Sequence, residues 1–146
     1  MTTNNIELFD VLTGRVFAEL YQHFPVAEHL ESWNYRDLFT GTPIQDGWLA
    51  KEDAIFFQST VEWLGNAGYI EHGNSLNNGD VQFCVLTAKG LEVLKALPVS
   101  LQSGQTLGDR LVDASKGGAK EVLRGVASEA LSLGARMLTT HLGLPS

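Results

Sequence analysis

The stretch TVEWLGNAGYI at residues 60–70, followed after residues 71–80 by VQFCVLTAKGLEVLKAL at residues 81–97, decides the fold of this chain. The first stretch contains the end of a helix that we expect over residues 51–66. Apolar residues recur there at three- and four-residue steps, and Gly68 is placed to end the helix. Two strand-like runs enclose a loop that contains Asn77-Asn78-Gly79-Asp80, and Asn-Gly between such runs predicts a β-hairpin. Thr87 is placed to cap a further helix over residues 88–97, which Pro98 ends.

Two more helices are expected before this stretch. Apolar residues recur with helical spacing over residues 6–23, and Pro25 stops that helix; a short helix is expected over residues 27–33. The order helix, helix, helix, hairpin, helix resembles that of winged helix-turn-helix domains of the MarR and PadR kind, and the resemblance covers about residues 50–97. The residues that carry it lead into the wing (Leu64, Gly68, Tyr69, Ile70) and out of it (Leu86, Thr87, Lys89, Gly90). The resemblance implies a winged-helix fold and, by the usual role of these families, a DNA-binding regulator.

The face of helix 51–66 that relatives of this kind present to the major groove is chemically unusual here. It carries two carboxylates and no cation, and the loop GNSLNNGD at residues 73–80 has no basic residue either. Contacts to phosphates supply much of the affinity for DNA, so we favour a non-enzymatic module for protein–protein interaction or regulation. The alternative is a DNA-binding transcription regulator that contacts bases through Gln, Asn and Ser side chains. The candidate interaction residues are Glu52, Ile55, Ser59, Glu62, Asn66, Asn77 and Asn78.

Charge is distributed unevenly along the chain, whose formal net charge is -7. Residues 1–100 hold five basic and thirteen acidic residues, whereas residues 101–146 hold five basic and four acidic ones. An anionic domain is repelled by nucleic-acid phosphates and by anionic lipid. The same charge also serves to keep a small protein soluble. Nucleic acid is therefore a disfavoured partner, and a membrane surface an unlikely one.

The C-terminal third predicts a helical tail. We expect a winged-helix domain at residues 1–97, a polar linker at 98–108 and an amphipathic helix at 109–142, with apolar residues that repeat about every eleven positions. Its glycines make an isolated helix marginal, so the helix must dock on its own domain, on a second copy of the chain to form a dimer, or on another protein. The residues expected to dock are Leu111, Val122, Val126, Leu133 and Met137.

Signals for chemistry are weak. The four histidines are dispersed, and the sequence has no HExxH, paired CxxC, GxSxG, P-loop or GxGxxG pattern, so we expect no enzyme, cofactor or metal site. The single cysteine, Cys84, is expected to pack in the core, and the sequence favours a cytoplasmic protein. No run approaches the roughly 20 apolar residues that span a bilayer. Four aromatic residues are expected to cap the core or, alternatively, to line a groove: Trp33, Tyr35, Phe39 and Trp48.

Overall fold

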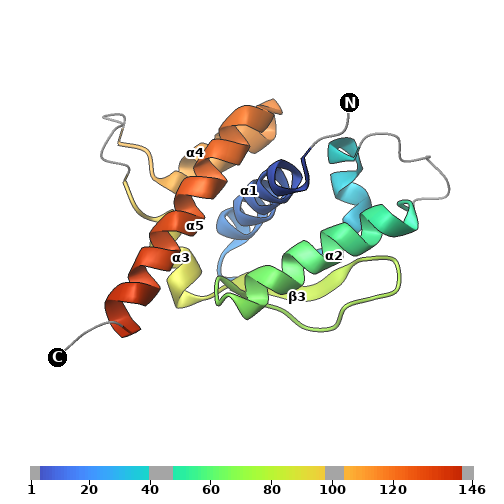
Figure 1. Cartoon of the computed structure of the whole chain (residues 1–146), viewed down its shortest axis with the longest axis horizontal. Coiled ribbons are helices and arrows are strands. Elements are labelled where there is room, and N and C mark those ends of the chain that lie inside the picture. The colour runs from blue at the N-terminus through green and yellow to red at the C-terminus, as the bar shows by residue number, and fades with distance from the viewer. Residues whose placement is uncertain (1–3, 40–47, 98–103, 143–146) are drawn as a thin grey trace.

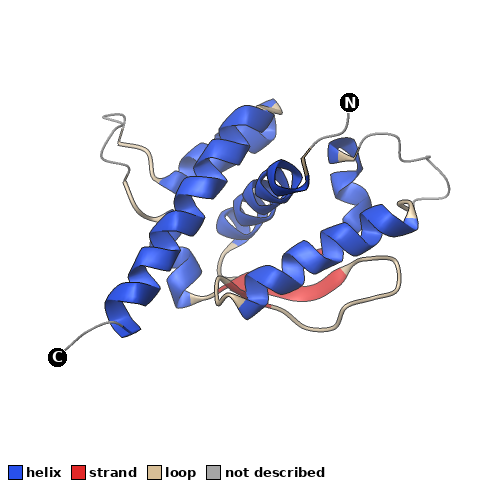
Figure 2. Ribbon diagram, viewed as in Figure 1, coloured by secondary structure: helices blue, strands red, loops and turns tan. Residues whose placement is uncertain are grey.

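The chain is mainly helical with a small antiparallel sheet, as the sequence predicts (Figure 1, Figure 2). The structure, a computed structural model, describes residues 4–39, 48–97 and 104–142. Its elements in chain order are α1 (Asn5–His23), β1 (Glu28–Leu30), the 3-10 helix η1 (Ser32–Leu38), α2 (Lys51–Asn66), β2 (Ile70–Glu71), β3 (Val81–Leu86), α3 (Ala88–Leu94), α4 (Leu107–Gly117) and α5 (Lys120–Leu142). None of the helices in these ranges is long and apolar enough to cross a membrane.

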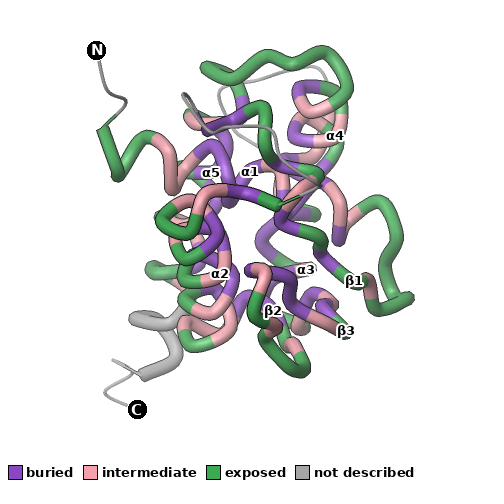
Figure 3. Tube along the Cα trace, turned by 90° about the vertical axis from the view of Figure 1, so that its right-hand side faces the viewer, coloured by how far each residue is buried: buried purple, intermediate pink, exposed green. Residues whose placement is uncertain are grey.

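Helix α1 lies at the centre of the molecule, between α5 on one side and α2 on the other (Figure 1). It begins where the Asn4 side chain accepts a hydrogen bond from the Ile6 amide, and it ends just before Pro25. Most residues in the middle of α1 are buried, and Figure 3 draws buried residues in purple. A helix that is buried on several sides needs apolar residues on several sides, and α1 has them: Val11, Leu12, Val16, Phe17, Ala18 and Leu20.

The sheet confirms the predicted hairpin and adds a strand that the sequence analysis assigned to a helix. Strands β2 and β3 pair antiparallel, with Ile70 opposite Leu86. Residues 27–33, expected as a helix, instead form β1 and the start of η1, because β1 pairs with the far edge of β3 to give the order β1-β3-β2. The pairing buries Leu30, which is 2% exposed, and its register shifts by one residue at a bulge that contains Phe83, at φ 57°.

The prediction of one continuous helix over residues 109–142 is wrong, because this part of the chain forms two helices, α4 and α5. Helix α4 begins earlier, at Leu107, where Thr106 and Asp109 form a capping box, and it ends at Gly117, just before Gly118, whose φ of 70° is left-handed. Helix α5 starts two residues later, and both helices pack against each other and against α1. Buried residues of α4 and α5 therefore belong to the same hydrophobic core as those of α1, α2 and the sheet.

Close contacts explain two of the glycines in this arrangement. A Cβ on Gly14 of α1 would lie 2.9 Å from the backbone oxygen of Leu123 in α5, so the two helices approach as closely as they do because no side chain separates them. Gly134 of α5 similarly faces the ring and hydroxyl of Tyr69, which donates a hydrogen bond to the backbone oxygen of Leu131 at 3.0 Å. These contacts attach α5 to the rest of the fold.

Candidate functional site

The residues predicted for the interaction face of α2 lie on its outer side. The buried residues of α2 are Ala54, Phe57, Thr60, Val61 and Leu64. On the opposite side, Glu52, Ser59 and Asn66 are exposed, Ile55 is 54% exposed and Glu62 is partly exposed. Of the two loop residues in the prediction, Asn77 is exposed and Asn78 is partly buried. The outer side of α2 and the loop that follows β2 thus form one surface, which we call the α2 face.

Hydrogen bonds hold the loop of residues 73–80 against α2. The Gln58 amide donates to the backbone oxygen of Leu76 at 2.7 Å, and the Ser75 hydroxyl donates to Glu62 at 2.6 Å. The side-chain amide of Gln58, which the DNA-binding alternative would use to contact bases, therefore already has a partner within the chain. This partner was not visible in the sequence, because it depends on how the loop folds back.

Asp80 anchors the other end of the same loop. It is 7% exposed, and its carboxylate accepts hydrogen bonds from the Ser32 amide at 2.8 Å and from the Asn78 side chain at 3.1 Å. His29 Nε2 lies 3.2 Å from the same carboxylate. Asn78 is thus also engaged inside the chain, and the Asp80 network fixes the loop relative to η1.

The two glutamates of the α2 face form no ion pair among the described residues. Glu52 points to solvent, and the only side-chain hydrogen bond to Glu62 among the described residues is the one from Ser75. In the described part of the chain, no lysine or arginine forms an ion pair with either glutamate. Both carboxylates therefore remain available to attract a cationic partner.

Two hollows are lined in part by residues of α2. The first, of about 380 Å³, lies between the start of α1 and α2, and its lining includes Ile6, Phe9 and Trp63. The second, of about 330 Å³, lies where the start of α2 meets the loop, and its lining includes Trp48 and Ile55. Four of these large apolar side chains are about half exposed or more, namely Ile6 (61%), Trp48 (55%), Ile55 (54%) and Trp63 (48%). The α2 face thus combines exposed apolar groups with two glutamates, and one cation, Lys51, lines the second hollow beside Ile55.

The other aromatic residues considered as groove-lining mostly complete the core. Tyr35 and Phe39 are buried and Trp33 is partly buried, and the Tyr35 ring packs on that of Phe57 with centroids 4.7 Å apart. Two members of this set line a hollow: Trp48 lines the one at the start of α2, and Tyr35 lines a smaller one of about 130 Å³ beside Arg15 and Glu19.

The tail residues divide into buried and exposed ones. Leu111 and Val126 are buried, and Leu133 and Met137 are partly buried against the core. Val122 is 37% exposed, because the break at Gly118 resets the helical phase that would have aligned it with Leu111. The apolar side of α4 and α5 contacts α1 of the same chain.

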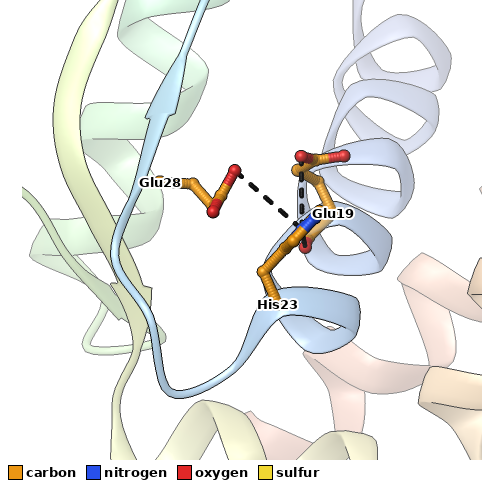
Figure 4. Close-up of side chains that lie close together, drawn as sticks. All are labelled: Glu19, His23 and Glu28. Carbon is orange, nitrogen blue, oxygen red and sulfur yellow. Dashed lines mark hydrogen bonds and ion pairs between the residues drawn. The ribbon is translucent and has the colours of Figure 1, made fainter.

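Titratable groups add little sign of catalysis in the described residues. Cys84 is fully buried, and burial raises the pKa of its thiol to about 12, so the thiol is a poor nucleophile. His23 lies beside Glu19 and Glu28 (Figure 4). A hydrogen bond to the Glu19 backbone oxygen, together with these two carboxylates, raises the pKa of His23. This cluster was not predicted from the sequence, although Glu19 and His23 have the four-residue spacing of one helical face.

The chain matches no protein-family model, and no match is found among curated proteins or solved structures.

Proposed function

We propose that this chain is a winged-helix module that works in the cytoplasm by binding another protein through the α2 face. Its occupant is a basic amphipathic segment of the partner, whose apolar residues enter the two hollows and whose lysines or arginines pair with the carboxylates. The single observation that carries the proposal is the exposure of Ile55 between Glu52 and Glu62, neither of them in an ion pair within the described residues.

The winged-helix part of the proposal rests on the order of elements. Helix α2, the β2–β3 hairpin and α3 follow each other as in the MarR- and PadR-like families, and β1 completes a three-stranded sheet. In such a module α2 is the helix that relatives present to the DNA groove. Here the same position carries an acidic and apolar surface.

Two physical effects favour a basic amphipathic partner. Covering half-exposed Ile and Trp side chains removes apolar area from water, which is the main driving force of most protein association. Opposite charges around that apolar centre speed the encounter and select against anionic partners. Tryptophans such as Trp48 and Trp63 also bind arginine and lysine side chains through cation–π contact.

A binding titration with designed peptides tests the proposal. The probes are a helical peptide of leucines and lysines, the same peptide with glutamates in place of lysines, and a random DNA duplex, each followed through the tryptophan fluorescence of the full chain. We expect saturable binding of the lysine peptide only. The double variant E52K/E62K is expected to weaken it about tenfold, which corresponds to about 1.4 kcal/mol.

Matched controls separate the α2 face from general effects of charge and hydrophobicity. E92K/E129K makes the same charge change at exposed positions on α3 and α5 and should leave peptide affinity unchanged. Ile55→Ser should weaken binding, whereas Val26→Ser, at a residue that is 64% exposed elsewhere, should not. Equal binding of both peptides, or duplex binding that weakens steeply with salt, contradicts the proposal and favours the DNA-binding alternative.

A further inference from the structure

We infer that Glu19, His23 and Glu28 form a binding site for a divalent transition-metal ion, with Zn²⁺ as the best-fitting ion. The site lies at the end of α1, where the chain turns into β1 (Figure 4), and it shares no residue with the α2 face. It is independent of the function proposed above.

The donor atoms lie at separations close to those of a zinc site. His23 Nδ1 is 3.4 Å from Glu19 Oε2 and 3.9 Å from Glu28 Oε1, and one ligand atom from each residue lies within 4.8 Å of the others. A tetrahedral ion with nitrogen and oxygen ligands at about 2.0–2.2 Å separates neighbouring donors by about 3.3–3.6 Å. The cluster closes around an ion when the His23 ring turns Nδ1 from the Glu19 backbone oxygen, 2.9 Å away, toward the two carboxylates.

Local structure explains why these three side chains meet. Glu19 and His23 lie four residues apart, so both project from one face of the last turns of α1. The chain then turns tightly, with the Val26 amide donating to the His23 backbone oxygen at 2.9 Å, and β1 brings Glu28 back toward the helix. The pairing of β1 with β3 holds Glu28 opposite Cys84.

The chemistry of the donors selects the class of ion. Two carboxylates and one neutral imidazole carry two negative charges, which a dication neutralises. Imidazole nitrogen favours zinc and its transition-metal neighbours over magnesium and calcium, which prefer oxygen ligands only. Three protein ligands leave a fourth position for water.

The ligands are accessible to an incoming ion. The side chains of Glu19 and His23 are 41% and 43% exposed, and that of Glu28 is 25% exposed. A change at any of them therefore leaves the core in place, so variants report on metal binding rather than on folding.

Calorimetric titration of the full chain with Zn²⁺, and visible absorption with Co²⁺, tests the inference. We expect one ion per chain, a Co²⁺ spectrum typical of four-coordinate sites, and a rise in melting temperature with Zn²⁺ because the ion binds the folded state. His23→Gln and Glu28→Gln should each weaken Zn²⁺ binding about tenfold or more and abolish the Co²⁺ spectrum. The controls His29→Gln and Glu31→Gln remove a histidine and a glutamate a few residues away and should bind like the wild type.

Three outcomes would overturn the inference. They are the absence of saturable Zn²⁺ binding, Zn²⁺ binding that His23→Gln and Glu28→Gln leave unchanged, and Ca²⁺ or Mg²⁺ binding as tight as that of Zn²⁺. The second outcome would place the ion on other residues, and the third would mean that the imidazole is not a ligand.

Discussion

Replacing Gly14 by alanine adds one methyl group at the closest contact between α1 and α5. The new Cβ would meet the Leu123 backbone oxygen at 2.9 Å and the Leu123 side chain at 3.2 Å. A side-chain tip can move aside, but a backbone oxygen inside a packed helix cannot do so without shifting α5. The matched variant is Gly125→Ala, also inside a helix, where an added Cβ meets nothing within 4 Å.

The two variants differ in one physical effect. Each gains about 0.8–1 kcal/mol from the better helix propensity of alanine. Gly14→Ala also incurs the cost of overpacking, typically about 1–3 kcal/mol, so the difference in unfolding free energy between the variants should be about 1–3 kcal/mol. For a chain of this size, each kcal/mol moves the melting temperature by about 2–4 °C.

Thermal and urea unfolding followed by circular dichroism measures this difference. Gly125→Ala should melt above the wild type, and Gly14→Ala should melt below Gly125→Ala by the stated margin. If both variants are stabilised equally, α5 does not pack on α1 at Gly14, and the arrangement of the C-terminal helices described here is wrong.

Three further predictions concern the core, the loop and the cysteine. Leu111→Ala removes a fully buried side chain between α4 and α1 and should lower the unfolding free energy in urea by about 2–5 kcal/mol. Because the contact is within one chain, the unfolding midpoint should not depend on protein concentration, and such a dependence would indicate a dimer instead. Asp80→Ala leaves the buried Ser32 amide without its acceptor and should cost about 1–3 kcal/mol, whereas Asp80→Asn keeps an acceptor oxygen and should cost less; equal losses would mean that the hydrogen bond is unimportant. Cys84, with its pKa raised to about 12 by burial, should react with iodoacetamide at pH 8 only after unfolding, and rapid labelling of the native protein would contradict its burial.

Local patterns predicted the elements whose partners are close in sequence. Helix α2 has the expected bounds, Lys51–Asn66, and the hairpin of β2 and β3 forms around the Asn-Gly turn. In both cases short-range periodicity and turn chemistry agree with the tertiary contacts.

Two predictions were wrong, the helix over residues 27–33 and the unbroken helix of the tail, because contacts distant in sequence decide the structure there. Residues 27–33 look helical by themselves, but β1 forms because it pairs with β3 more than fifty residues later and because Asp80 binds the Ser32 amide. The apolar residues of the tail repeat about every eleven positions across Gly117 and Gly118. The left-handed Gly118 nevertheless lets the chain turn, so that α4 and α5 both contact α1. No local signal distinguishes such a glycine from one inside a helix.

The candidate site also has features that the sequence predicts and features that depend on distant contacts. The exposure of Glu52 and Ile55 follows from helical spacing and was predictable. The engagement of Gln58 and Asn78 depends on the fold of the loop and was not. In the His23 cluster, the helical pair with Glu19 is visible in the sequence, whereas Glu28 joins it only through the turn after Pro25.

Anisotropy of a labelled random DNA duplex, titrated with the full chain at about 50 mM and about 200 mM salt, tests most directly whether the α2 face is unsuited to nucleic acid. We predict no saturable binding by the wild type at either salt concentration, and weak, salt-sensitive binding by E52K/E62K, in which two cations replace two carboxylates on that face. Wild-type binding that falls steeply between the two salt concentrations would contradict the account.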